Sequence, residues 1–295
     1  MDLHSAPAPH RPALDGLTAL LACPHCAATP LARDGRSLRC PIGHSFDIAR
    51  HGYVSLLRGD RRHRHLGDDP AMVAARDRFL SAGHYRPLVS TVTAFAVEHA
   101  GPAEPVVLDL AAGTGHHLAA VVDAVPGARG LAVDLSGAAL RRAARVHPRV
   151  AAVAADVWRE LPVAPGSAQV VLTVFGPRNA AEIERVLDRR GVLVVAGAAP
   201  DHLHELRDLL GTLGVDPHAP ARRRAAFAAF EPVARQPVTW RMALHPEDVR
   251  SLVAMGPSAR HLDPAELDRA VAALPATVGV TAAIEVLAMR PRSGG

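Results

Sequence analysis

The sequence lacks any apolar run long enough to cross a bilayer as a helix, which argues against an integral membrane protein. It also lacks an N-terminal charged region followed by an apolar stretch, so we expect a soluble, cytoplasmic protein. Aromatic residues make up only 3% of the 295 residues, so a core must be built mainly from alanine, valine and leucine. Apolar residues still reach 49%, enough for one large or two modest domains.

Cysteine is scarce, and its placement is informative. The three cysteines form Cys23-Pro-His-Cys26 and Cys40-Pro-Ile-Gly-His44. Three thiols cannot all pair as disulfides, and a redox C-x-x-C belongs at a helix start in a βαβ unit, which this stretch is not. Two tight turns that each present two ligands fit a tetrahedral zinc ion. The pattern predicts a structural zinc site of Cys23, Cys26, Cys40 and His44, with His25 as a bystander.

The stretch at 106–118 organises the rest of the chain. Residues 106–110 are apolar except for Asp109 and predict a buried strand. Gly113-Thr-Gly115 then predicts a turn, and a helix with apolar periodicity follows it. Glycine suits a turn whose backbone must approach a ligand. Asp134 ends the next predicted strand, nineteen residues after Gly115, where such folds place an acid on a ribose.

The details of this turn favour one cofactor over another. A dinucleotide site requires a third glycine where this chain has Leu118, and bulky His116 and His117 suit a ligand without phosphates. An acid before the turn, a shortened glycine pattern and an acid after the second strand look like the S-adenosylmethionine (SAM) site of a class I methyltransferase. Ala111 departs from that pattern, so the turn must tolerate a Cβ there. A tight turn in an α/β protein without this cofactor is the alternative.

Alternating strand and helix patterns continue to the end of the chain. We expect strands at 106–110, 130–133, 149–154, 168–175, 191–198, 238–244 and 278–289, and helices at 70–79, 87–98, 137–146, 179–190, 201–213, 246–255 and 264–274. Ser136 is the expected N-cap of one helix, and Asn179 with Glu182 has the spacing of a capping box. This order predicts a doubly wound parallel sheet of seven strands whose last strand is antiparallel.

A basic stretch links the two regions. Residues 58–69 contain Arg58, Arg61, Arg62 and Arg64 with no apolar period. A solvated linker and a loop that contacts RNA phosphates both fit this composition, and the adjacent zinc module favours the second. The net charge of +4 indicates only a mild preference for an anionic partner.

Several motifs together resemble one family. They are Cys-Pro-x-Cys from Cys23, Cys-Pro-x-Gly-His-x-Phe-Asp-x-Ala-Arg-x-Gly-Tyr-Val-x-Leu-Leu from Cys40, Met-Val-Ala-Ala-Arg from Met72, Ser-Ala-Gly-His-Tyr from Ser81, and Asp-x-x-x-Gly-Thr-Gly-His-His from Asp109. Over roughly residues 20–290 the chain resembles the RlmA family of 23S rRNA guanine-N1 methyltransferases, in particular the Gram-positive branch that contains tylosin-resistance methylases.

The resemblance implies a class I SAM-dependent methyltransferase with a Rossmann-like seven-stranded sheet, a small N-terminal zinc-binding domain and a homodimer. The substrate that it implies is a guanine, position 748 in this branch, in the helix 35 hairpin loop of 23S rRNA. The resistance methylases of the branch make macrolide (tylosin-type) resistance one expected consequence, which the sequence itself does not establish. We expect a flexible extension at 1–19, a zinc-binding RNA-recognition domain at 20–66, a helical connector at 67–100 and the methyltransferase domain at 101–295. The zinc and methyltransferase domains are expected to have separate cores.

The resemblance also suggests roles for individual residues. Tyr85, His117, Leu118 and His202 match SAM-contacting positions of the family, and would join Asp109, Gly113, Gly115, Asp134 and Asp156 in the cofactor site. The loop after the fourth strand carries target-base contacts in this class, so Phe175 is expected to stack on guanine and Arg178 to stabilise its O6. Asp156 is assigned to the adenine of SAM, and Asp109 to a structural role near its methionine end.

Two other functions fit the same fold. A small-molecule SAM methyltransferase would need neither a zinc module nor a basic loop, so both features argue against it. A non-catalytic RNA-binding or assembly factor with a vestigial SAM fold is allowed by Ala111.

Overall fold

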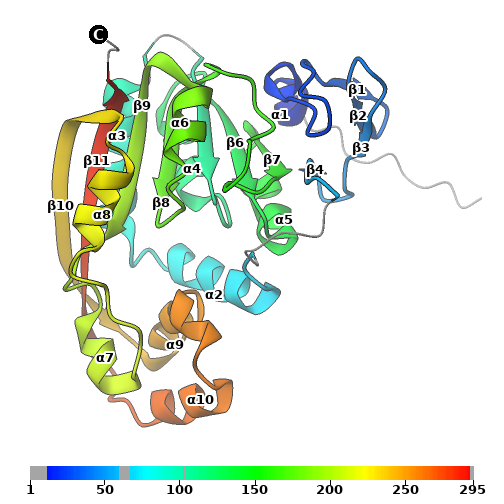
Figure 1. Ribbon diagram of the computed structural model, residues 1–295. Coiled ribbons are helices and arrows are strands. Elements are labelled where there is room, and N and C mark those ends of the chain that lie inside the picture. Colours follow the sequence, from blue (N-terminus) through cyan, green and yellow to red (C-terminus); the bar gives the residue numbers. More distant parts are fainter. Residues whose placement is uncertain (1–11, 60–66, 102–103, 293–295) are drawn as a thin grey trace, which may run out of the picture.

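The computed structural model describes residues 12–59, 67–101 and 104–292, and one large sheet organises them (Figure 1). The sheet has eight strands in the order β10-β11-β9-β8-β5-β6-β7-β4. In chain order its strands are β4 (Val54–Ser55), β5 (Val106–Leu110), β6 (Arg129–Asp134), β7 (Val150–Ala154), β8 (Ala168–Val174), β9 (Leu187–Ala198), β10 (Phe230–Leu244) and β11 (Val278–Pro291). A second sheet of three short strands holds β1 (Ala32–Asp34), β2 (Ser37–Arg39) and β3 (Ser45–Asp47).

Strand direction follows the predicted pattern. Strands β4 to β9 of the large sheet pair in parallel, and β11 runs antiparallel to both β9 and β10. The class I fold predicted from the sequence is therefore confirmed, with β4 as an additional eighth strand. The strand order reverses between β5 and β8, and in open α/β sheets such a reversal opens a crevice at the carboxyl ends of the strands.

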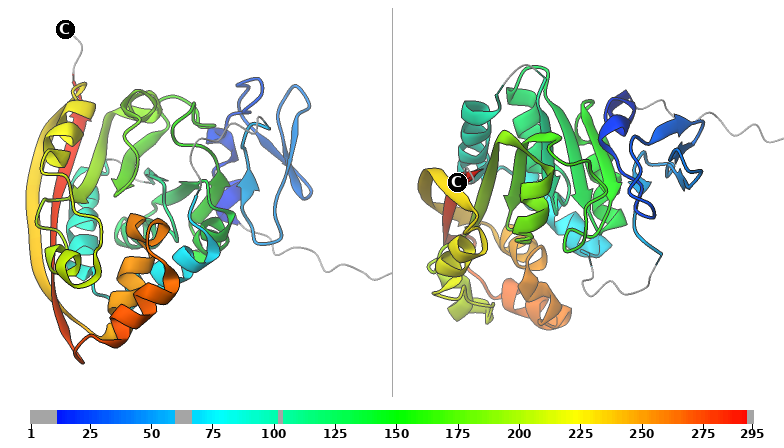
Figure 2. Two further views of the ribbon diagram at one scale, coloured as in Figure 1. Left: turned by 60° about the horizontal axis from the view of Figure 1, so that its bottom comes forward. Right: turned by 45° about the horizontal axis from the view of Figure 1, so that its top comes forward.

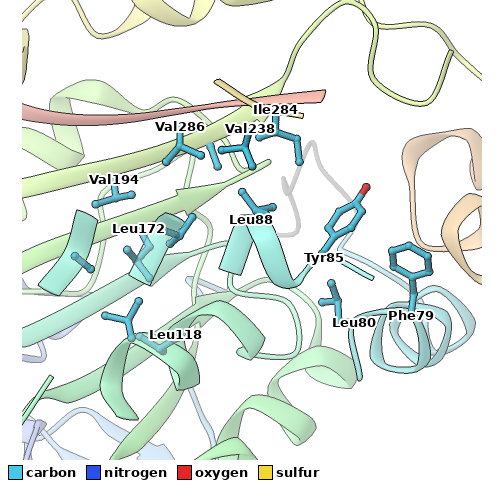
Figure 3. Close-up of a cluster of buried hydrophobic side chains, with 14 of the residues drawn as sticks. Phe79, Leu80, Tyr85, Leu88, Leu118, Leu172, Val194, Val238, Ile284 and Val286 are labelled. Atoms are coloured by element: carbon cyan, nitrogen blue, oxygen red, sulfur yellow. The ribbon is translucent and has the colours of Figure 1, made fainter. Parts of the chain in front are cut away.

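Helices cover both faces and one end of the sheet. The helices are α1 (Pro12–Asp15), α2 (Pro70–Ser81), α3 (Arg86–His99), α4 (His116–Ala124), α5 (Gly137–Val146), α6 (Ala180–Val186), α7 (His204–Leu210), α8 (Ala219–Ala226), α9 (Pro246–Ala254) and α10 (Pro264–Ala272), with 3-10 turns η1 (Thr18–Leu20) and η2 (Pro257–Arg260). Apolar residues of α3, α4 and α5 pack on one face; Figure 3 shows Leu88 of α3 and Leu118 of α4 in this cluster. Helices α2, α7, α9 and α10 lie beyond one end of the sheet (Figure 1). None of the described helices is long and apolar enough to span a membrane.

The zinc module, which is the described part of the predicted zinc-binding domain at 20–66, is not independent of the α/β sheet. Strand β4 pairs with β7, and Leu21 forms a bridge with Val163. Leu31 and Leu38 of the module belong to the same buried cluster as Val153 of β7. The expectation of separate cores is therefore wrong: a module this small completes its core against the exposed edge of the sheet, beside which it lies in Figure 2.

The N-terminal region is partly folded. Residues 1–11 lie outside the described residues, but α1 and η1 occupy much of the remainder of the predicted extension at 1–19. Leu14 and Leu17 are fully buried there. Apolar spacing in this proline-rich stretch was the available signal, because Leu14, Leu17 and Leu21 recur at helical intervals and join the module's core.

Several predicted boundaries differ from the structure. The predicted capping box is absent, because the Asn179 amide donates to backbone carbonyls and Glu182 pairs instead with Arg185 at 2.7 Å between Oε2 and Nη2. The helix also ends at Val186, where β9 begins. Strand β10 starts eight residues earlier than predicted, since an edge strand accommodates Pro232 and Pro237. The Ser136 cap is confirmed: its Oγ accepts from the Ala139 amide at 3.2 Å.

Candidate functional site

The four predicted metal ligands converge in the zinc module. One ligand atom from each of Cys23, Cys26, Cys40 and His44 lies within 4.8 Å of all the others. The sulfur atoms of Cys26 and Cys40 are 3.8 Å apart, and Cys23 Sγ lies 3.6 Å from His44 Nδ1. Ligands at about 2.3 Å from a tetrahedral zinc ion are separated by about 3.8 Å. The donor set and spacing therefore fit structural zinc.

The electrostatics of the module also suit a metal. Burial opposes ionisation of Cys40, but hydrogen bonds from the His44 side chain and nearby backbone amides lower the pKa of its thiol to about 6. A thiolate is the form that binds metal. His25 stacks on Phe46 with ring centroids 5.8 Å apart and is not part of the four-atom cluster. Four protein ligands leave no open coordination position, so this ion would stabilise the fold and not catalyse.

A second candidate site is a cavity of about 740 Å³ at the carboxyl ends of β5, β6, β8 and β9. It lies at the reversal of strand order, as expected for this fold. Six of the predicted cofactor and target-base residues line it: Tyr85, His117, Asp134, Phe175, Arg178 and His202. These six residues lie far apart in the chain, and the fold brings them to the wall of one cavity.

The turn after β5 has the conformation that its glycines suggested. Gly113 and Gly115 have φ of +55° and +77°, a region that L side chains rarely adopt. Ala111 also lies there at +57°, so the chain accommodates a Cβ at this position with some strain. The Gly113 amide donates to Asp134 Oδ2 at 2.8 Å, and the Ser136 amide donates to Oδ1 at 2.8 Å. Asp134 thereby holds the turn in place at the cavity wall.

Five predicted cofactor residues do not line the cavity: Gly113 and Gly115 belong to the turn just described, and Leu118, Asp109 and Asp156 lie behind the wall. Leu118 is fully buried in the core, where Figure 3 shows it among other apolar side chains. Asp109 is buried, and desolvation followed by repulsion from Asp134 raises the pKa of its carboxyl well above the usual value. Asp156 accepts a hydrogen bond from the Trp158 amide at 3.0 Å, and it is Trp158 that lines the cavity. Leu118, Asp109 and Asp156 thus pack behind the residues that line the cavity and support their positions.

Three rings form a continuous wall at the other side of the cavity. The Tyr85 and Phe175 centroids are 6.4 Å apart, and the Phe175 and His202 centroids are 5.9 Å apart. The Phe175 side chain is 46% exposed and its φ is +54°, a strained conformation that is common at functional sites. Residues predicted separately as cofactor and base contacts are therefore neighbours.

His202 has a defined protonation state. The Ala283 amide donates to His202 Nδ1 at 3.2 Å, so Nδ1 is an acceptor and the proton lies on Nε2, 3.4 Å from the Tyr85 hydroxyl. Burial lowers the pKa of His202 to about 4 and raises that of Tyr85. Both groups are therefore uncharged at neutral pH, and the His202 Nε2–H is a donor.

Three arginines of the cavity wall had no predicted role in the site: Arg76, Arg223 and Arg260. Arg76 of α2 pairs with Asp68 at 2.6 Å and donates to the carbonyl of Met255, the residue that follows α9, at 2.8 Å, which links α2 to the end of α9. It belongs to a motif used only for the family resemblance. Arg223 of α8 is 4% exposed and also lines the cavity. Burial, followed by repulsion from Arg223 and Arg222, lowers the pKa of Arg178.

Comparisons with known proteins match both regions of the chain. Residues 21–63 match a family model described as "RlmA, N-terminal", and residues 107–191 match one described as "Methyltransferase domain". A Micromonospora griseorubida protein named as a 23S rRNA (guanine-N1)-methyltransferase is 49% identical over 289 residues, covering 92% of this chain and 97% of its own. The Streptomyces fradiae 23S rRNA (guanine(748)-N1)-methyltransferase is 45% identical over 273 residues, covering 92% and 96%.

Solved structures show more distant similarity. A SAM-dependent methyltransferase of Thiobacillus denitrificans, in complex with S-adenosyl-L-homocysteine, has a TM-score of 0.45 at 17% identity and covers 69% of this chain and 90% of its own. The YcgJ protein of Bacillus subtilis has a TM-score of 0.48 at 16% identity and covers 70% and 100%.

Proposed function

The chain belongs to the RlmA-type 23S rRNA (guanine-N1)-methyltransferases, and from this premise we propose that it methylates N1 of guanine 748 in the helix 35 loop of 23S rRNA. The name of the Streptomyces fradiae relative supports the choice of guanine. The observation that carries the proposal is the single cavity in which the glycine turn and Asp134 adjoin the exposed ring of Phe175. An exposed aromatic ring there suits a planar base.

The residues around the turn fit the cofactor. We assign the ribose of SAM to Asp134, its adenine to the wall formed by Val157 and Trp158, and its methionine end to the side of His117. The Nδ1 atom of His117 is buried and has no partner among the described residues, so it is available to a ligand. When bound, SAM supplies a methyl group on a sulfonium, which is already activated for displacement.

The target guanine is assigned to the other half of the cavity. Its ring would stack on Phe175, and it must leave its own stack to do so. Guanine N1 has to lose a proton before its lone pair can attack, and the negative charge then moves toward O6. Arg178 would stabilise that charge and so lower the pKa of N1. His202 holds its proton on the nitrogen that faces Tyr85, so we assign removal of the N1 proton to water.

Methyl transfer to RNA tests this proposal directly. Purified protein with tritiated SAM should label naked 23S rRNA, and primer extension should stop at guanine 748, because an N1 methyl group blocks Watson–Crick pairing. Phe175→Ala and Arg178→Ala should each lower the rate by about 10²-fold or more, as for loss of a group that orients the base or stabilises its charge. Val233→Ala and Arg189→Ala, which change exposed residues outside the cavity, are the matched controls.

The outcomes separate the competing functions. Label in a small-molecule extract but not in 23S rRNA would favour a small-molecule methyltransferase. RNA binding without transfer of label would favour a non-catalytic assembly factor. A stop at a different guanine would keep the reaction and contradict the position.

Three further properties belong to the proposal. A ribosomal RNA substrate supports a cytoplasmic location. The family resemblance supports a homodimer, which sedimentation equilibrium would test. It also supports resistance to tylosin-type macrolides, which should disappear when the gene is deleted from its host and return with the wild-type gene but not with Arg178→Ala.

A further inference from the structure

An arginine lies flat against the sheet beside the proposed guanine pocket. Gly197 of β9 and Glu285 of β11 are directly opposite each other in an antiparallel pair, so their side chains share one face of the sheet. A Cβ on Gly197 would overlap the guanidinium of Arg223. The missing side chain therefore creates the space that Arg223 occupies, and glycine is needed there for close approach.

The arginine is held there by a buried carboxylate. Arg223 and Glu285 are 4% and 5% exposed, and Arg223 Nη2 lies 3.1 Å from Glu285 Oε2. Glu285 also pairs with Arg235 at 2.7 Å and with Arg224 at 3.6 Å. The Nε–H of Arg223 is buried, and within the described part of the chain it has no acceptor. A buried donor without a partner is costly, which suggests that a ligand satisfies it.

The arginines around this position outnumber the carboxylates that pair with them, so the local net charge is positive. The ion pairs of Arg222, Arg223, Arg224 and Arg235 involve two carboxylates, Asp216 and Glu285. Arg178 adds a fifth guanidinium, with no carboxylate partner among residues 12–59, 67–101 and 104–292. Repulsion from Arg223 and Arg222 contributes to the lowered pKa of Arg178, so these groups lie close enough to interact. Such a cluster attracts an anion.

We propose that Arg223 binds a backbone phosphate next to the target guanine, at a subsite that Gly197 and Glu285 build into the cavity wall, while the neighbouring Arg178 stays with guanine O6. The inference rests on the proposed function. Guanidinium groups bind phosphate with directed, charge-assisted hydrogen bonds. Because Arg178, Arg223 and Phe175 line the same cavity, a phosphate here would fix the flipped nucleotide relative to the ring on which its base stacks.

Neutral phosphate analogues provide the test. The substrate is the shortest 23S rRNA fragment that the wild type methylates, synthesised with a single methylphosphonate at each loop phosphate in turn. One position beside the target should lower kcat/KM of the wild type by about tenfold or more, as for loss of a hydrogen bond to a charged group. In Arg223→Ala the same substitution should change kcat/KM by less than about twofold, since the phosphate has already lost its partner.

Matched variants distinguish this role from a structural one. Arg235→Ala removes another guanidinium from Glu285, but its side chain is 63% exposed and outside the cavity, so it should keep the wild-type sensitivity. Gly197→Ala displaces Arg223 without changing any charge and should lose that sensitivity. Unchanged SAM affinity of Arg223→Ala, measured by calorimetry, excludes the SAM carboxylate as the anion.

Each outcome supports or overturns the proposal. The proposal would be overturned if no single methylphosphonate lowered kcat/KM of the wild type. This measurement does not depend on any variant being folded. Equal sensitivity of Arg223→Ala and wild type would also overturn it, as would a weakened SAM affinity in that variant. Failure of the wild type to methylate any 23S rRNA would instead refute the proposed function on which it rests.

Discussion

Zinc removal should destabilise the whole chain, because the zinc module and the sheet share one apolar core. Five aliphatic side chains of the module are at most 2% exposed and belong to the same cluster as the sheet: Leu21, Leu31, Leu38, Val54 and Leu56. Full burial of one such side chain contributes about 1.5–3 kcal/mol. Roughly 10 kcal/mol of gross burial energy therefore depends on an ordered module.

Even if half of this burial survives without metal, the loss is about 5 kcal/mol. Each kcal/mol lowers the Tm of a large domain by about 2–4 °C, so we expect the main transition to fall by about 10 °C or more. Scanning calorimetry of zinc-loaded protein, chelated protein and Cys40→Ser measures this shift. Ile42→Ser is the control: it changes the same turn, but Ile42 is 70% exposed and is not a ligand, so zinc and Tm should be retained.

The same perturbation should reach the cofactor cavity. Strand β4 pairs with β7, and the chain that leaves β7 carries Val157 and Trp158 into the cavity wall. We therefore expect chelation to weaken SAM binding as well as to lower the Tm. If chelated protein kept the main transition and the SAM affinity of the zinc-loaded form, the zinc module and the sheet would not depend on one shared core.

Three further predictions concern the cavity and the RNA. Gly113→Val places a branched side chain at positive φ, 3.0 Å from Arg76 Nη1, so calorimetry should show loss of SAM binding while circular dichroism shows a folded protein. His202 is neutral when folded, with a pKa of about 4 against about 6.5 unfolded, so stability is complete above pH 6.5 and falls by about 3 kcal/mol as the pH drops to 4. Urea unfolding of His202→Gln should show a weaker pH dependence there. Arg61, Arg62 and Arg64 lie outside the described residues; replacing all three with alanine should reduce the salt slope of RNA binding by about two to three, while an equal slope would indicate a solvated linker.

Most of the fold could be predicted because its signals are local. The apolar strand that contains Asp109, the one that ends in Asp134, the glycine turn between them and the Ser136 cap each depend on neighbours in the chain. The zinc cluster was predictable for the same reason, since its ligands occupy two short turns. The family resemblance added Tyr85 and His202, whose sequence contexts contain no local signal of a ligand site.

The remaining features depend on contacts between distant segments. Nothing near Leu31 or Leu38 in the sequence indicates that they pack against β7, so the shared core could not be foreseen. Leu118 follows the turn directly and matches a cofactor position by motif, yet the helical rotation from His117 to Leu118 directs one side chain to the cavity and the next into the core. Motif position alone cannot distinguish these two orientations.

One signal for the phosphate subsite was nevertheless present in the sequence. Glu285 interrupts an apolar strand, and a charged residue that is to be buried in a sheet requires a partner of opposite charge. The partners are arginines of α8 and β10, and the sequence around each of them predicts only a solvent-exposed side chain. Antiparallel pairing places Gly197 directly opposite Glu285. One strand register therefore produces both the space above Gly197 and the carboxylate that holds Arg223 in it. A shift of this register by one residue would turn Glu285 to the opposite face, which explains why charge, glycine and arginine form a site only once the sheet has assembled.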